Sequence, residues 1–581
     1  MTAYVTWTVD QNISGLLWGS MWTAEPFTYS FPTSAADYPG YADIRGFEAF
    51  NASQQNGARY AFNQIASYIP RTFVETTGSN ALFRLAEADA VNYTDNQFVA
   101  INRGLHGITT AEANLPEHAG DNPAYTPLRL SPSYAQGHSW YNHTDYNNPT
   151  VGSAALQAGI MHEIGHTLGL KHGHAAEGQF PALPFERDSY EYSVMTYRQY
   201  VGDDPATGDS APHHATTFQI NDIAALQYMY GANFSTNAGN TTYTWNATTG
   251  DYFINGVSQG APSSGNYVLM SIWDGGGQDT YFLGNFTTNL TIDLRPGGAG
   301  IVMPGLAANL GDGHFARASV YNPYLYGGIH TASLIENAYG GSGDDVIYGN
   351  QVANLVVGGA GRDSLVGNGG ADQLAGQSGS DYIYGGDDGD AISGGTEGDS
   401  LSGDGGADYI LGEAGNDAIA GGAGGDVIDG GGDNDTLWGH DPSGAGDLGD
   451  LINGGSGNDV IIGHSGADRL YGGSGQDTIA GGSDGDVIYG EAGNDELFGG
   501  AGGDAFVFDQ ANFAADNIWD FTPGQDKIIM STALFANFAA IRAAAVGGPG
   551  VTVITQSGGH GQIALQGFGV DALNANDFVF F

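Results

Sequence analysis

The stretch His162–His172, "HEIGHTLGLKH", brings three histidines and one glutamate together in a short segment. His162 and His166 are four residues apart, so on a helix the two imidazoles project from the same face and can reach one metal ion. Gly169 accepts the left-handed backbone that ends a helix, and that turn can return His172 as a third ligand. Three neutral nitrogen ligands suit zinc and leave one coordination position open for water, as in catalytic sites.

The residues around this stretch support the same interpretation. The preceding "SAALQAGIM" spaces its apolar residues as a buried helix does. Glu163 lies beside the first ligand and is the natural acceptor for a proton of the bound water. A bare HExxH occurs by chance in long chains, but Gly169, His172 and the downstream "YSVMTY" with Met195 complete the metzincin signature. The pattern therefore predicts a zinc protease.

Composition points to a second metal. The 581 residues are enough for several domains, and 15 Lys+Arg against 64 Asp+Glu give a formal net charge of -49. Such a chain lacks the basic footprint that nucleic-acid binding needs. Hydrophobic residues at 41% and aromatic residues at 11% disfavour disorder. We therefore expect calcium to balance the acidic excess.

Targeting signals are sparse. There are no cysteines, which fits both a reducing cytosol and a disulfide-free secreted protein. The first residues, "MTAYVTWTVDQNISGLL", do not form a secretory signal of the usual kind. No run of 18 or more apolar residues is present, so we expect no membrane span.

A nine-residue period begins at Gly340. Eleven repeats run through "GGGDNDTLW" at 430, the fifteen-residue unit "GHDPSGAGDLGDLIN" at 439 interrupts them, and six more run from 454 to "GGAGGDAFV" at 499. The pattern G-G-x-G-x-D-x-U-x, with U a large apolar residue, is the calcium-binding parallel β-helix repeat of RTX proteins. A flexible linker would not keep an apolar residue at one repeat position throughout.

Each part of the repeat has a role. The glycine-rich half makes a tight turn, and its carbonyls with the Asp carboxylate supply hard oxygen ligands for Ca²⁺. The x-U-x half is a short strand whose U side chain points inward. Two repeats make one coil, so we expect calcium between turns 18 residues apart, at most about nine such pairings in the first run and about four in the second. Asn354 replaces the usual Asp, so sites that involve it should be weak or absent.

The predicted calcium ligands of the repeats are Asp345, Asp363, Asp372, Asp381, Asp390, Asp399, Asp408, Asp417, Asp426, Asp435, Asp459, Asp468, Asp477, Asp486 and Asp495. Without calcium these carboxylates repel one another and the strands are too short to hold alone. Folding of the repeats should therefore be coupled to metal binding.

With these motifs the chain resembles the serralysins, secreted bacterial metzincin proteases with a C-terminal RTX β-roll. The similarity covers nearly the whole length. It is carried further by "ISGLLWGSMW" and "YSFP" near the start, by "NDIAALQYMYGAN" at 221, and by "IWDGGGQDT", "IDLR" and "IENAYGGSGDD" before the repeats.

The resemblance implies roles for the zinc-site residues. His162, His166 and His172 would bind zinc, and Glu163 would be general base and then proton donor. Met195 would form an apolar floor beneath the histidines. Tyr197 would be a further zinc ligand that swings away to stabilise the oxyanion, although a plain buried tyrosine is the alternative.

The segment "GHSWYN" at 137 is similar to the family's active-site edge strand. An edge strand has unpaired backbone groups to which an extended peptide can add. Trp140 and Tyr141 would line that edge, or would simply be packing residues. We expect surface positions, not ligand roles, for His138, His143, His174, His213 and His214.

The resemblance also implies a calcium site before the repeats. Asp274, Gly276 and Asp279 match the family's pattern, with Glu336 and the backbone oxygen of Leu334. Gly239 and Thr241 would contribute carbonyls, but Asn237 stands where the family has arginine.

The chain departs from the family's sequence pattern in two respects and resembles it in a C-terminal secretion signal. After His172 the family continues with Pro-Gly, whereas this chain reads "GHAAEGQFPALPFERDSYEYS", which leaves cleavage preference open. The chain shows little room for a propeptide. The closing "DFVFF" is similar to the family's uncleaved type I secretion signal, which implies export from a Gram-negative bacterium by the type I secretion machinery.

We therefore expect a multidomain protein: an α+β metzincin catalytic domain (1–235), a β-sandwich part (236–338), an all-β parallel β-roll (339–507), and a cap with the secretion signal (508–581). The leading hypothesis is an extracellular, monomeric zinc endopeptidase that acts on proteins or peptides, with one catalytic Zn²⁺ and several structural Ca²⁺. The alternative is a calcium-dependent adhesive surface protein with an inactive protease-like head, against which the intact Glu163 argues.

Overall fold

The computed structural model describes most of the chain, in two compact units. The described residues are 2–4, 10–14, 16–17, 20–23, 25–37, 41–45, 47–77, 81–87, 90–93, 98–100, 112–113, 137–141, 149–174, 176, 180–204, 211–262, 265–322, 334–440, 448–510, 513–548, 550–556 and 561–581. The first unit comprises Met1–Phe282 with Asp293–Ile335, and the second Leu283–Ile292 with Glu336–Phe581. The expected division into four domains stays a prediction.

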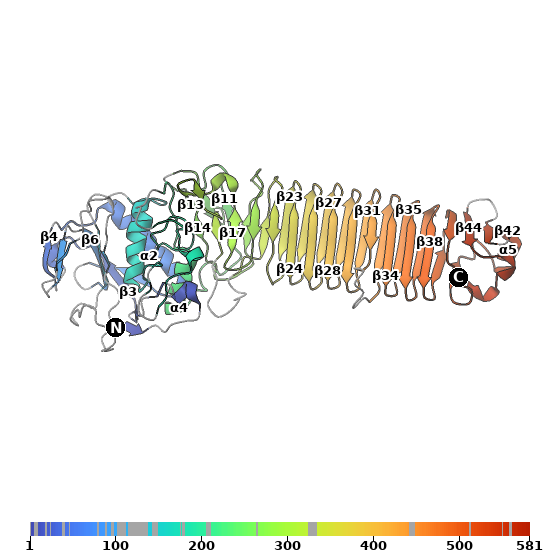
Figure 1. The fold of residues 1–581 in the computed structure, drawn as a ribbon, viewed down its shortest axis with the longest axis horizontal. Coiled ribbons are helices and arrows are strands. Elements are labelled where there is room, and N and C mark those ends of the chain that lie inside the picture. The colour runs from blue at the N-terminus through green and yellow to red at the C-terminus, as the bar shows by residue number, and fades with distance from the viewer. Residues whose placement is uncertain are drawn as a thin grey trace. The chain divides into compact units, whose positions relative to one another are not determined.

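A five-stranded sheet organises the first unit (Figure 1). Its order is β5 (Phe73–Glu75), β3 (Phe27–Ser30), β6 (Phe83–Glu87), β10 (Gly137–Tyr141), β9 (Glu112–Ala113). The first four strands are parallel, and β9 pairs antiparallel with β10. A separate antiparallel sheet joins β4 (Tyr41–Arg45), β7 (Ala90–Tyr93) and β8 (Phe98–Ala100), and β1 (Thr2–Tyr4) pairs with β2 (Ser20–Trp22).

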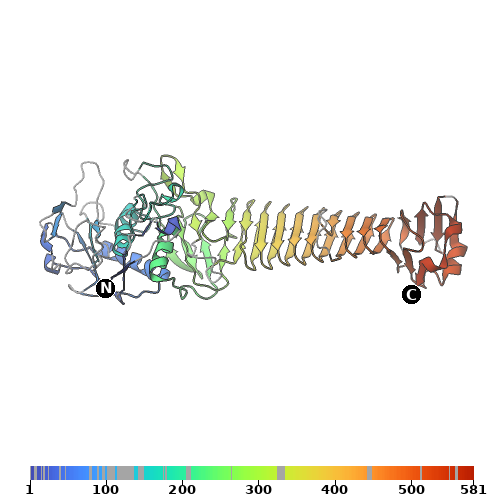
Figure 2. The same ribbon diagram turned by 60° about the horizontal axis from the view of Figure 1, so that its bottom comes forward.

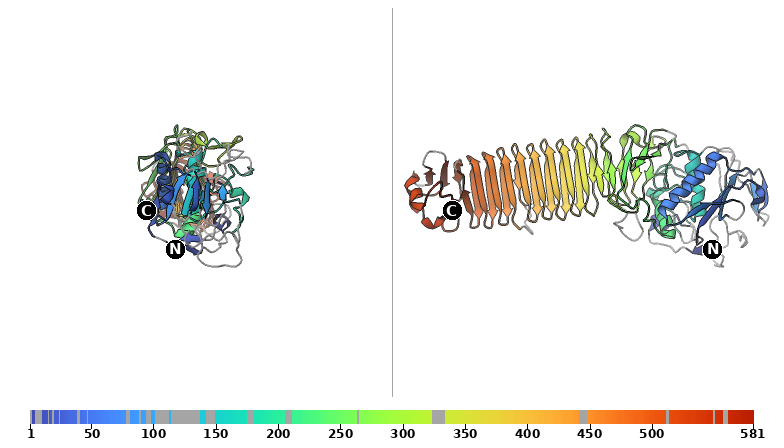
Figure 3. Two further views of the ribbon diagram at one scale, coloured as in Figure 1. Left: turned by 90° about the vertical axis from the view of Figure 1, so that its left-hand side faces the viewer. Right: turned by 180° about the vertical axis from the view of Figure 1, so that it is seen from behind.

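Helix α2 (Ala52–Tyr68) covers one face of this sheet, as the right view of Figure 3 shows. It begins with a reciprocal capping box between Asn51 and Gln54, which satisfies two backbone donors of the first turn. On its buried face Phe62 stacks on Tyr29 of β3 at 4.4 Å and on Phe73 of β5 at 5.2 Å between ring centroids. Aromatic packing thus fixes the helix to the sheet.

The helix predicted around the histidines is present. A π-helical segment η3 (Ala155–Met161) runs directly into α3 (His162–Thr167). Such wide turns inside helices are found mostly at functional sites. Gly169 has φ 102°, and the Leu170 N–H donates to Gly165 O at 3.1 Å, so a left-handed glycine ends the helix as predicted.

The C-terminal end of α3 is held by two distant segments. The Trp22 indole N–H donates to Thr167 O at 2.6 Å, and the hydroxyl of Tyr230 donates to Leu168 O at 2.7 Å. Tyr230 closes helix α4 (Ile220–Tyr230), which the segment "NDIAALQYMYGAN" predicted. These bonds satisfy carbonyls that a helix end leaves without intrahelical partners.

The remainder of the first unit is mainly short strands, with α1 (Gln11–Ser14) and the 3₁₀ turns η1 (Ala35–Asp37), η4 (Phe185–Arg187) and η5 (Pro304–Leu306). The strands are β11 (Thr242–Trp245), β12 (Tyr252–Ile254), β13 (Val257–Gly260), β14 (Met270–Ser271), β15 (Thr280–Phe282), β17 (Ala299–Val302), β18 (Asn309–Gly311), β19 (His314–Phe315) and β20 (Val320–Tyr321). Strand β16 (Thr291–Asp293) lies where the chain passes between the units. None of the helices in the described ranges is long and apolar enough to cross a membrane.

The second unit is a roll of two parallel sheets, which confirms the predicted β-roll (Figures 1 and 2). One sheet contains β21 (Asn337–Tyr339), β23 (Leu355–Ala360), β25 (Gln373–Ser378), β27 (Ala391–Thr396), β29 (Tyr409–Ala414), β31 (Val427–Gly432), β33 (Leu451–Ser456), β35 (Arg469–Gly475), β37 (Val487–Gly493), β39 (Ala505–Phe508), β41 (Lys527–Met530) and β45 (Phe578–Phe580). The other contains β22 (Val346–Tyr348), β24 (Ser364–Gly369), β26 (Tyr382–Asp387), β28 (Ser400–Gly405), β30 (Ala418–Ala423), β32 (Thr436–Trp438), β34 (Val460–Ser465), β36 (Thr478–Ser483), β38 (Glu496–Ala501) and β40 (Ala514–Ile518).

Register confirms two repeats per coil. Val356 of β23 pairs with Leu374 of β25, 18 residues later, and every second strand belongs to the same sheet. The apolar U residues form the core of the roll, and those from Ile347 to Phe506 are at most 2% exposed. Most strands are longer than the predicted three residues, because the start of the glycine-rich half also pairs with the next coil.

The cap follows the last repeat. β40 pairs with β44 (Gly561–Gln566), which continues through β43 (Val551–Thr555) to β42 (Ala545–Gly548). Helix α5 (Phe538–Ala544) and the 3₁₀ turns η7 (Val570–Ala572) and η8 (Ala575–Asp577) complete it.

Candidate zinc and calcium sites

The three predicted zinc ligands converge on one point. His172 Nε2 lies 3.0 Å from His166 Nε2 and 3.1 Å from His162 Nε2. Among the described residues, they form the one group of three or more His, Cys, Asp or Glu side chains whose ligand atoms all lie close enough to share a metal ion. Nitrogens at about 2.0–2.1 Å from a tetrahedral zinc lie roughly 3.3 Å from one another, so the spacing fits zinc.

The protonation of His162 and His166 also suits a bound cation. His162 Nδ1 lies 2.8 Å from Val194 O, and His166 Nδ1 lies 2.8 Å from Leu170 O. A carbonyl can only accept, so each Nδ1 carries the proton and each Nε2 presents a lone pair. Burial lowers the pKa of His162 to about 3 and of His166 to about 4, which keeps both rings neutral. Converging lone pairs without a proton between them fit a bound Zn²⁺.

Met195 lies beneath the histidines. It is fully buried, and its Sδ is 2.5 Å from where a Cβ on Gly165 would be. The backbone next to it supplies the carbonyl of Val194 that orients His162. The turn that carries Val194 is itself held by Asp222, which accepts the Val194 N–H at 2.8 Å and the Ser193 hydroxyl at 2.6 Å. Sequence reasoning missed Asp222, because nothing local links it to this turn.

Tyr197 and Glu163 lie at the same site. The Tyr197 hydroxyl is 2.8 Å from His172 Nε2, and its ring stacks on that of His162 with centroids 5.5 Å apart. Tyr197 is 47% exposed, so the plain buried tyrosine considered from the sequence is wrong. Glu163 is buried in the first turn of α3, directly after the first ligand.

Three histidines expected at the surface are packed instead. His214 is 3% exposed, the His213 ring stacks on Tyr267 with centroids 4.1 Å apart, and the His174 ring stacks on His172 at 5.4 Å. The apolar faces of imidazoles pack well against other rings, which composition could not reveal. The side chain of His138 and all of His143 lie outside the described residues.

The predicted edge strand is not at the edge. β10 lies between β6 and β9, and Trp140 pairs with Glu112 of β9, so β9 forms the edge among the described strands. The pairing partner is a two-residue strand that carries no recognisable sequence pattern. Both β9 and β10 lie beside α3. The side chains of Trp140 and Tyr141 lie outside the described part, so their substrate role stays a prediction.

In most repeats of the roll, the carboxylate has the same arrangement. Oδ1 of Asp372 accepts the N–H of Asn354 at 2.7 Å, 18 residues earlier. Its Oδ2 is buried, without a hydrogen-bond partner among the described residues, and lies 2.2 Å from where a Cβ on Gly367 would be. The carbonyl of Gly385 approaches the same point at 2.4 Å. A side chain would fill this space, and its oxygens are the ligands that Ca²⁺ takes.

The same orphaned Oδ2 recurs in Asp363, Asp381, Asp390, Asp399, Asp408, Asp417, Asp435, Asp459, Asp477, Asp486 and Asp495. Burial and neighbouring carboxylates raise the pKa of Asp363, Asp372 and Asp477 to about 7. Asp426 Oδ1 and Asp468 Oδ1 likewise accept an N–H from 18 residues earlier, from Asp408 at 2.9 Å and from Asp450 at 2.8 Å. Buried carboxylate oxygens in a row fit a series of cations.

Two positions differ from the regular repeat. The Asn354 side chain places Oδ1 at the position that Asp Oδ2 takes elsewhere, but this oxygen accepts the Asn350 N–H at 2.7 Å, and Nδ2 donates to Asn350 Oδ1 at 3.1 Å, so the repeat offers a hydrogen-bonded neutral amide in place of a carboxylate. Asp345 is also unusual, because the N–H groups of Leu290 and Gly341 donate to its two oxygens, both at 2.7 Å. Both turns are poorer candidates for calcium than the turns that follow.

Sequence reasoning missed Asp450 and Asp504. Asp450 lies in the fifteen-residue unit, where its Oδ1 accepts the Asp426 N–H at 2.8 Å across 24 residues. Its Oδ2 lies 2.2 Å from where a Cβ on Gly439 would be, as in a regular turn. Asp504 Oδ1 accepts the Asp486 N–H at 3.0 Å, as in the regular repeats. The sequence signal was present, since "DLIN" at 450 and "DAFV" at 504 both keep the D-x-U-x order.

The acidic residues predicted before the roll also come together. The Thr241 N–H donates to Asp279 Oδ1 at 2.8 Å, and the Gly276 N–H donates to Asp274 Oδ1 at 2.9 Å. The Thr241 hydroxyl donates to Gly239 O at 2.8 Å. Burial raises the pKa of Asp274, which is what close, desolvated carboxylates show without a cation.

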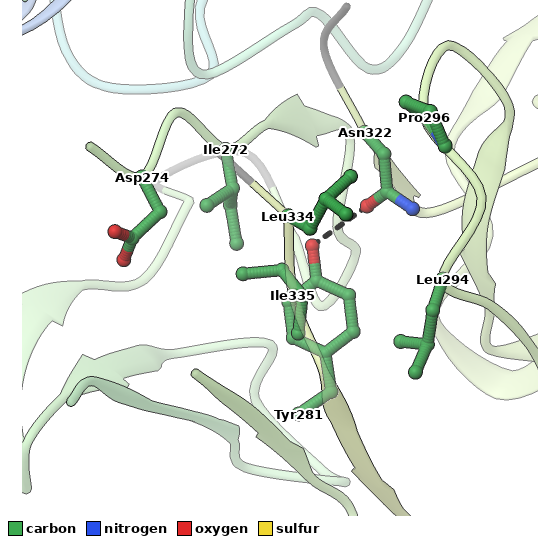
Figure 4. A pocket seen from close by; sticks show the side chains of 8 residues that line it. All are labelled: Ile272, Asp274, Tyr281, Leu294, Pro296, Asn322, Leu334 and Ile335. Carbon is green, nitrogen blue, oxygen red and sulfur yellow. Dashed lines mark hydrogen bonds between the residues drawn. The ribbon is translucent and has the colours of Figure 1, made fainter. Parts of the chain in front are cut away.

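The other residues predicted for this calcium site are linked to the two aspartates less directly. Leu334 lines a small cavity with Asp274, Tyr281 and Asn322, in which the Tyr281 hydroxyl donates to Asn322 Oδ1 at 2.7 Å (Figure 4). Glu336 belongs to the second unit. Asn237, in the place of arginine, has φ 51° and donates to the Tyr243 hydroxyl at 2.9 Å.

Three family models match segments of the chain. The Met-zincin model matches residues 146–242, and the peptidase M10 serralysin C-terminal model matches 232–315. The RTX calcium-binding nonapeptide repeat (4 copies) matches six segments between 333 and 506: 333–365, 349–383, 384–419, 411–441, 444–479 and 471–506. These matches confirm the metzincin and RTX parts, and zinc and calcium are the cofactors that they imply.

Curated relatives give the same result. The chain is 33% identical over 56% of its length to the metallopeptidase AprA of Pseudomonas marginalis, covering 60% of that protein. It is 31% identical to serralysin G of Dickeya chrysanthemi and 30% identical to serralysin of Proteus mirabilis, each over 56% of this chain and 59% of the relative. The chain thus spans about three fifths of the length of these relatives. The extracellular lipase LipA of Serratia marcescens aligns at 18% identity over 42% of this chain and 40% of its own, with a TM-score of 0.16, too low to indicate a shared fold.

Proposed function

We propose that this chain is a secreted zinc endopeptidase whose C-terminal roll folds with calcium. The observation that carries the proposal is the meeting of four side chains, with the Nε2 atoms of His162, His166 and His172 and the hydroxyl of Tyr197 at one point. Three histidine nitrogens with the remaining position left to an oxygen group, here the Tyr197 hydroxyl, are typical of catalytic zinc, whereas structural sites are closed by four Cys or His ligands.

The chain's own residues would divide the chemistry. Zinc, when bound, supplies a Lewis acid for the scissile carbonyl and lowers the pKa of a water. Glu163 would take a proton from the attacking water and return it to the leaving amine. Tyr197 would donate a hydrogen bond to the carbonyl oxygen as negative charge develops there. Met195 and Val194 would keep the histidine rings in place from below.

The substrate would be an extended segment of a protein or peptide. The sheet beside α3 ends at β9, whose outer side carries no strand among the described ranges. An extended chain can add to such an edge through its backbone, which gives affinity with little dependence on sequence. Trp140 and Tyr141, one strand further in, remain candidates for side-chain contacts.

Calcium would make folding of the roll depend on whether the protein is inside or outside the cell. The buried Asp carboxylates need a counter-ion, and millimolar calcium outside the cell supplies one. The roll would therefore stay unfolded until export. Export by the type I secretion machinery and a monomeric state of the protein are both part of the proposal.

The test is peptidase activity of the full chain, purified with calcium and zinc. We expect cleavage of casein and of a quenched fluorescent peptide, loss with a zinc chelator and recovery with Zn²⁺. Glu163→Gln should keep zinc but lower kcat/KM by about 10²–10⁴-fold, the contribution of general base catalysis. Glu186→Gln, an exposed glutamate in η4, is the matched control and should match wild type. A zinc-loaded, folded chain with no activity would support the adhesive alternative instead.

A further inference from the structure

Asp188 binds the chain on both sides of Tyr197. Its Oδ1 accepts the Thr196 hydroxyl at 2.5 Å, and its Oδ2 accepts the Arg198 Nε–H at 2.9 Å. The Arg198 N–H in turn donates to the Thr196 hydroxyl oxygen at 3.1 Å. One buried carboxylate, 4% exposed, therefore ties the two neighbours of the tyrosine to each other.

Asp188 also lies against the segment that carries the third ligand. A Cβ on Gly173, the residue after His172, would be 3.1 Å from Asp188 Oδ1. The same segment is joined to the methionine turn, because the Gly173 N–H donates to Met195 O at 3.1 Å. Asp188 is thus close to both segments of chain that meet at the metal site.

The position of Tyr197 depends in part on its backbone. Its side chain is 47% exposed, so packing constrains only part of it, yet its hydroxyl is 2.8 Å from His172 Nε2. The Tyr197 ring contacts those of His162, His172 and His174 at 5.5, 4.6 and 5.0 Å between centroids, and a fixed Cα limits the freedom that the exposed part of the side chain keeps. The bonds from Thr196 and Arg198 to one carboxylate fix the residues directly before and after that Cα.

We propose that Asp188 is a positioning residue that holds the Tyr197 hydroxyl at the metal site. The inference rests on the proposed peptidase function and goes beyond it, since it assigns a role to a carboxylate that bonds Thr196 and Arg198 and not a zinc-ligand nitrogen. Displacements near 1 Å at such a site can lower a rate by about 10²-fold, so a modest loosening of the turn should be measurable.

Asp188→Asn separates positioning from general stability. Asn keeps the shape and one oxygen, which can still accept from Thr196. Its NH₂ group faces the Arg198 Nε–H, so two donors meet and the bond on the far side of Tyr197 is lost. The ion pair between Arg198 and Asp188 goes with it. Glu186→Gln, two residues earlier and exposed, removes the same charge without touching the turn.

The first measurement is kinetic. Asp188→Asn should lower kcat about 3- to 30-fold with KM changed less than about twofold, in the range of couplings between contacting residues. In the Tyr197→Phe background the same substitution should change kcat less than twofold, because it acts through the hydroxyl that Phe lacks. Zinc content and the melting temperature of the first unit are measured alongside.

The second measurement does not use activity. In Cu²⁺-substituted protein, a phenolate close to the metal gives a visible charge-transfer absorption band. The band should be present in wild type and in Glu186→Gln, weakened in Asp188→Asn and absent in Tyr197→Phe.

The outcomes distinguish the two proposals. An inactive wild-type protein with a full copper band would contradict the peptidase proposal. The absorption spectra of the variants would then decide on the positioning role. Equal bands in wild type and Asp188→Asn, or an undiminished effect of Asp188→Asn on kcat in the Tyr197→Phe background, would overturn the positioning role. A wild-type protein without the band would overturn it as well, because Tyr197 would then not be held at the metal.

Discussion

Met195 Sδ lies 2.5 Å from where a Cβ on Gly165 would be, so the methionine turn and helix α3 touch without space for a methyl group. Gly165 stands between His162 and His166, on the turn that presents both imidazoles. Gly165, at a variable position of the HExxH motif, is therefore a packing requirement that the sequence pattern does not specify.

Gly165→Ala should disturb both stability and metal binding. Overpacking by one methyl costs about 1–3 kcal/mol, here at contact with the residue beneath the zinc ligands. We expect a lower melting temperature and faster zinc loss to a chelator. Gly305→Ala in η5, where a Cβ meets nothing within 4 Å, is the control and should stay within about 0.5 kcal/mol of wild type. Unchanged zinc retention in Gly165→Ala would show that the turn can move away freely.

Tyr197→Phe should lower kcat more than it raises KM. Loss of one oxyanion donor costs about 10²–10³-fold in kcat, and the phenyl ring keeps the stacking on His162. Steady-state kinetics at equal zinc content measures this. Tyr200→Phe, whose hydroxyl donates to Asp312 at 3.4 Å, is a nearby control that should keep wild-type rates. A change in KM alone would contradict the oxyanion role.

Removal of calcium should unfold the roll as a unit. Its carboxylates are buried in rows, and few lysines or arginines are available to neutralise them, so metal-binding energy is folding energy. Circular dichroism should lose strand signal with a calcium chelator and regain it with millimolar Ca²⁺. Mg²⁺ should not replace it, because it keeps its waters and a tighter octahedral shell. A strand signal that does not change with chelator would contradict the proposal that the roll folds with calcium.

Without calcium, the roll should be more stable at acid pH. Burial raises the pKa of Asp363, Asp372, Asp399 and Asp486 from the ordinary 3.8 to about 7 in the folded roll. A raised folded-state pKa contributes stability that is complete below the unfolded value and is lost as pH rises through the folded one. Chelated protein should therefore show more strand signal at pH 5 than at pH 8. The opposite trend would mean that the carboxylates are ionised in the folded roll without metal.

Asp450→Asn should remove calcium from the interrupted repeat. Asparagine keeps an oxygen for the Asp426 N–H but replaces by an amide NH₂ the Oδ2 that lies 2.2 Å from where a Cβ on Gly439 would be, and it removes the negative charge that Ca²⁺ needs. We expect at least one fewer bound calcium and a loss of about 1–3 kcal/mol at millimolar calcium. Asp429→Asn carries the same charge change on a strand residue that bonds Asn453, and is the control. Equal calcium counts in the two variants would show that the insertion has displaced the site.

The sequence by itself determined the elements whose residues lie close together along the chain. Helical period placed His162 and His166 on one face, and Gly169 then returned His172, all by local geometry. The nonapeptide period likewise set the coil, the inward position of residues such as Ile383 and Leu401, and the rows of carboxylates, because each repeat contacts only its neighbours.

Only the tertiary structure decided what depends on distant segments. Val194 and Asp222 fix the orientation of the histidines from elsewhere in the chain, and no local pattern announces such contacts. Strand β9, whose sequence shows no periodicity, forms the edge of the sheet in place of β10, because it pairs with β10 across a long separation in sequence. The role of Asp188 likewise appears only when Thr196 and Arg198 fold back onto it, since hydrogen-bond partners are chosen by packing and not by spacing in the sequence.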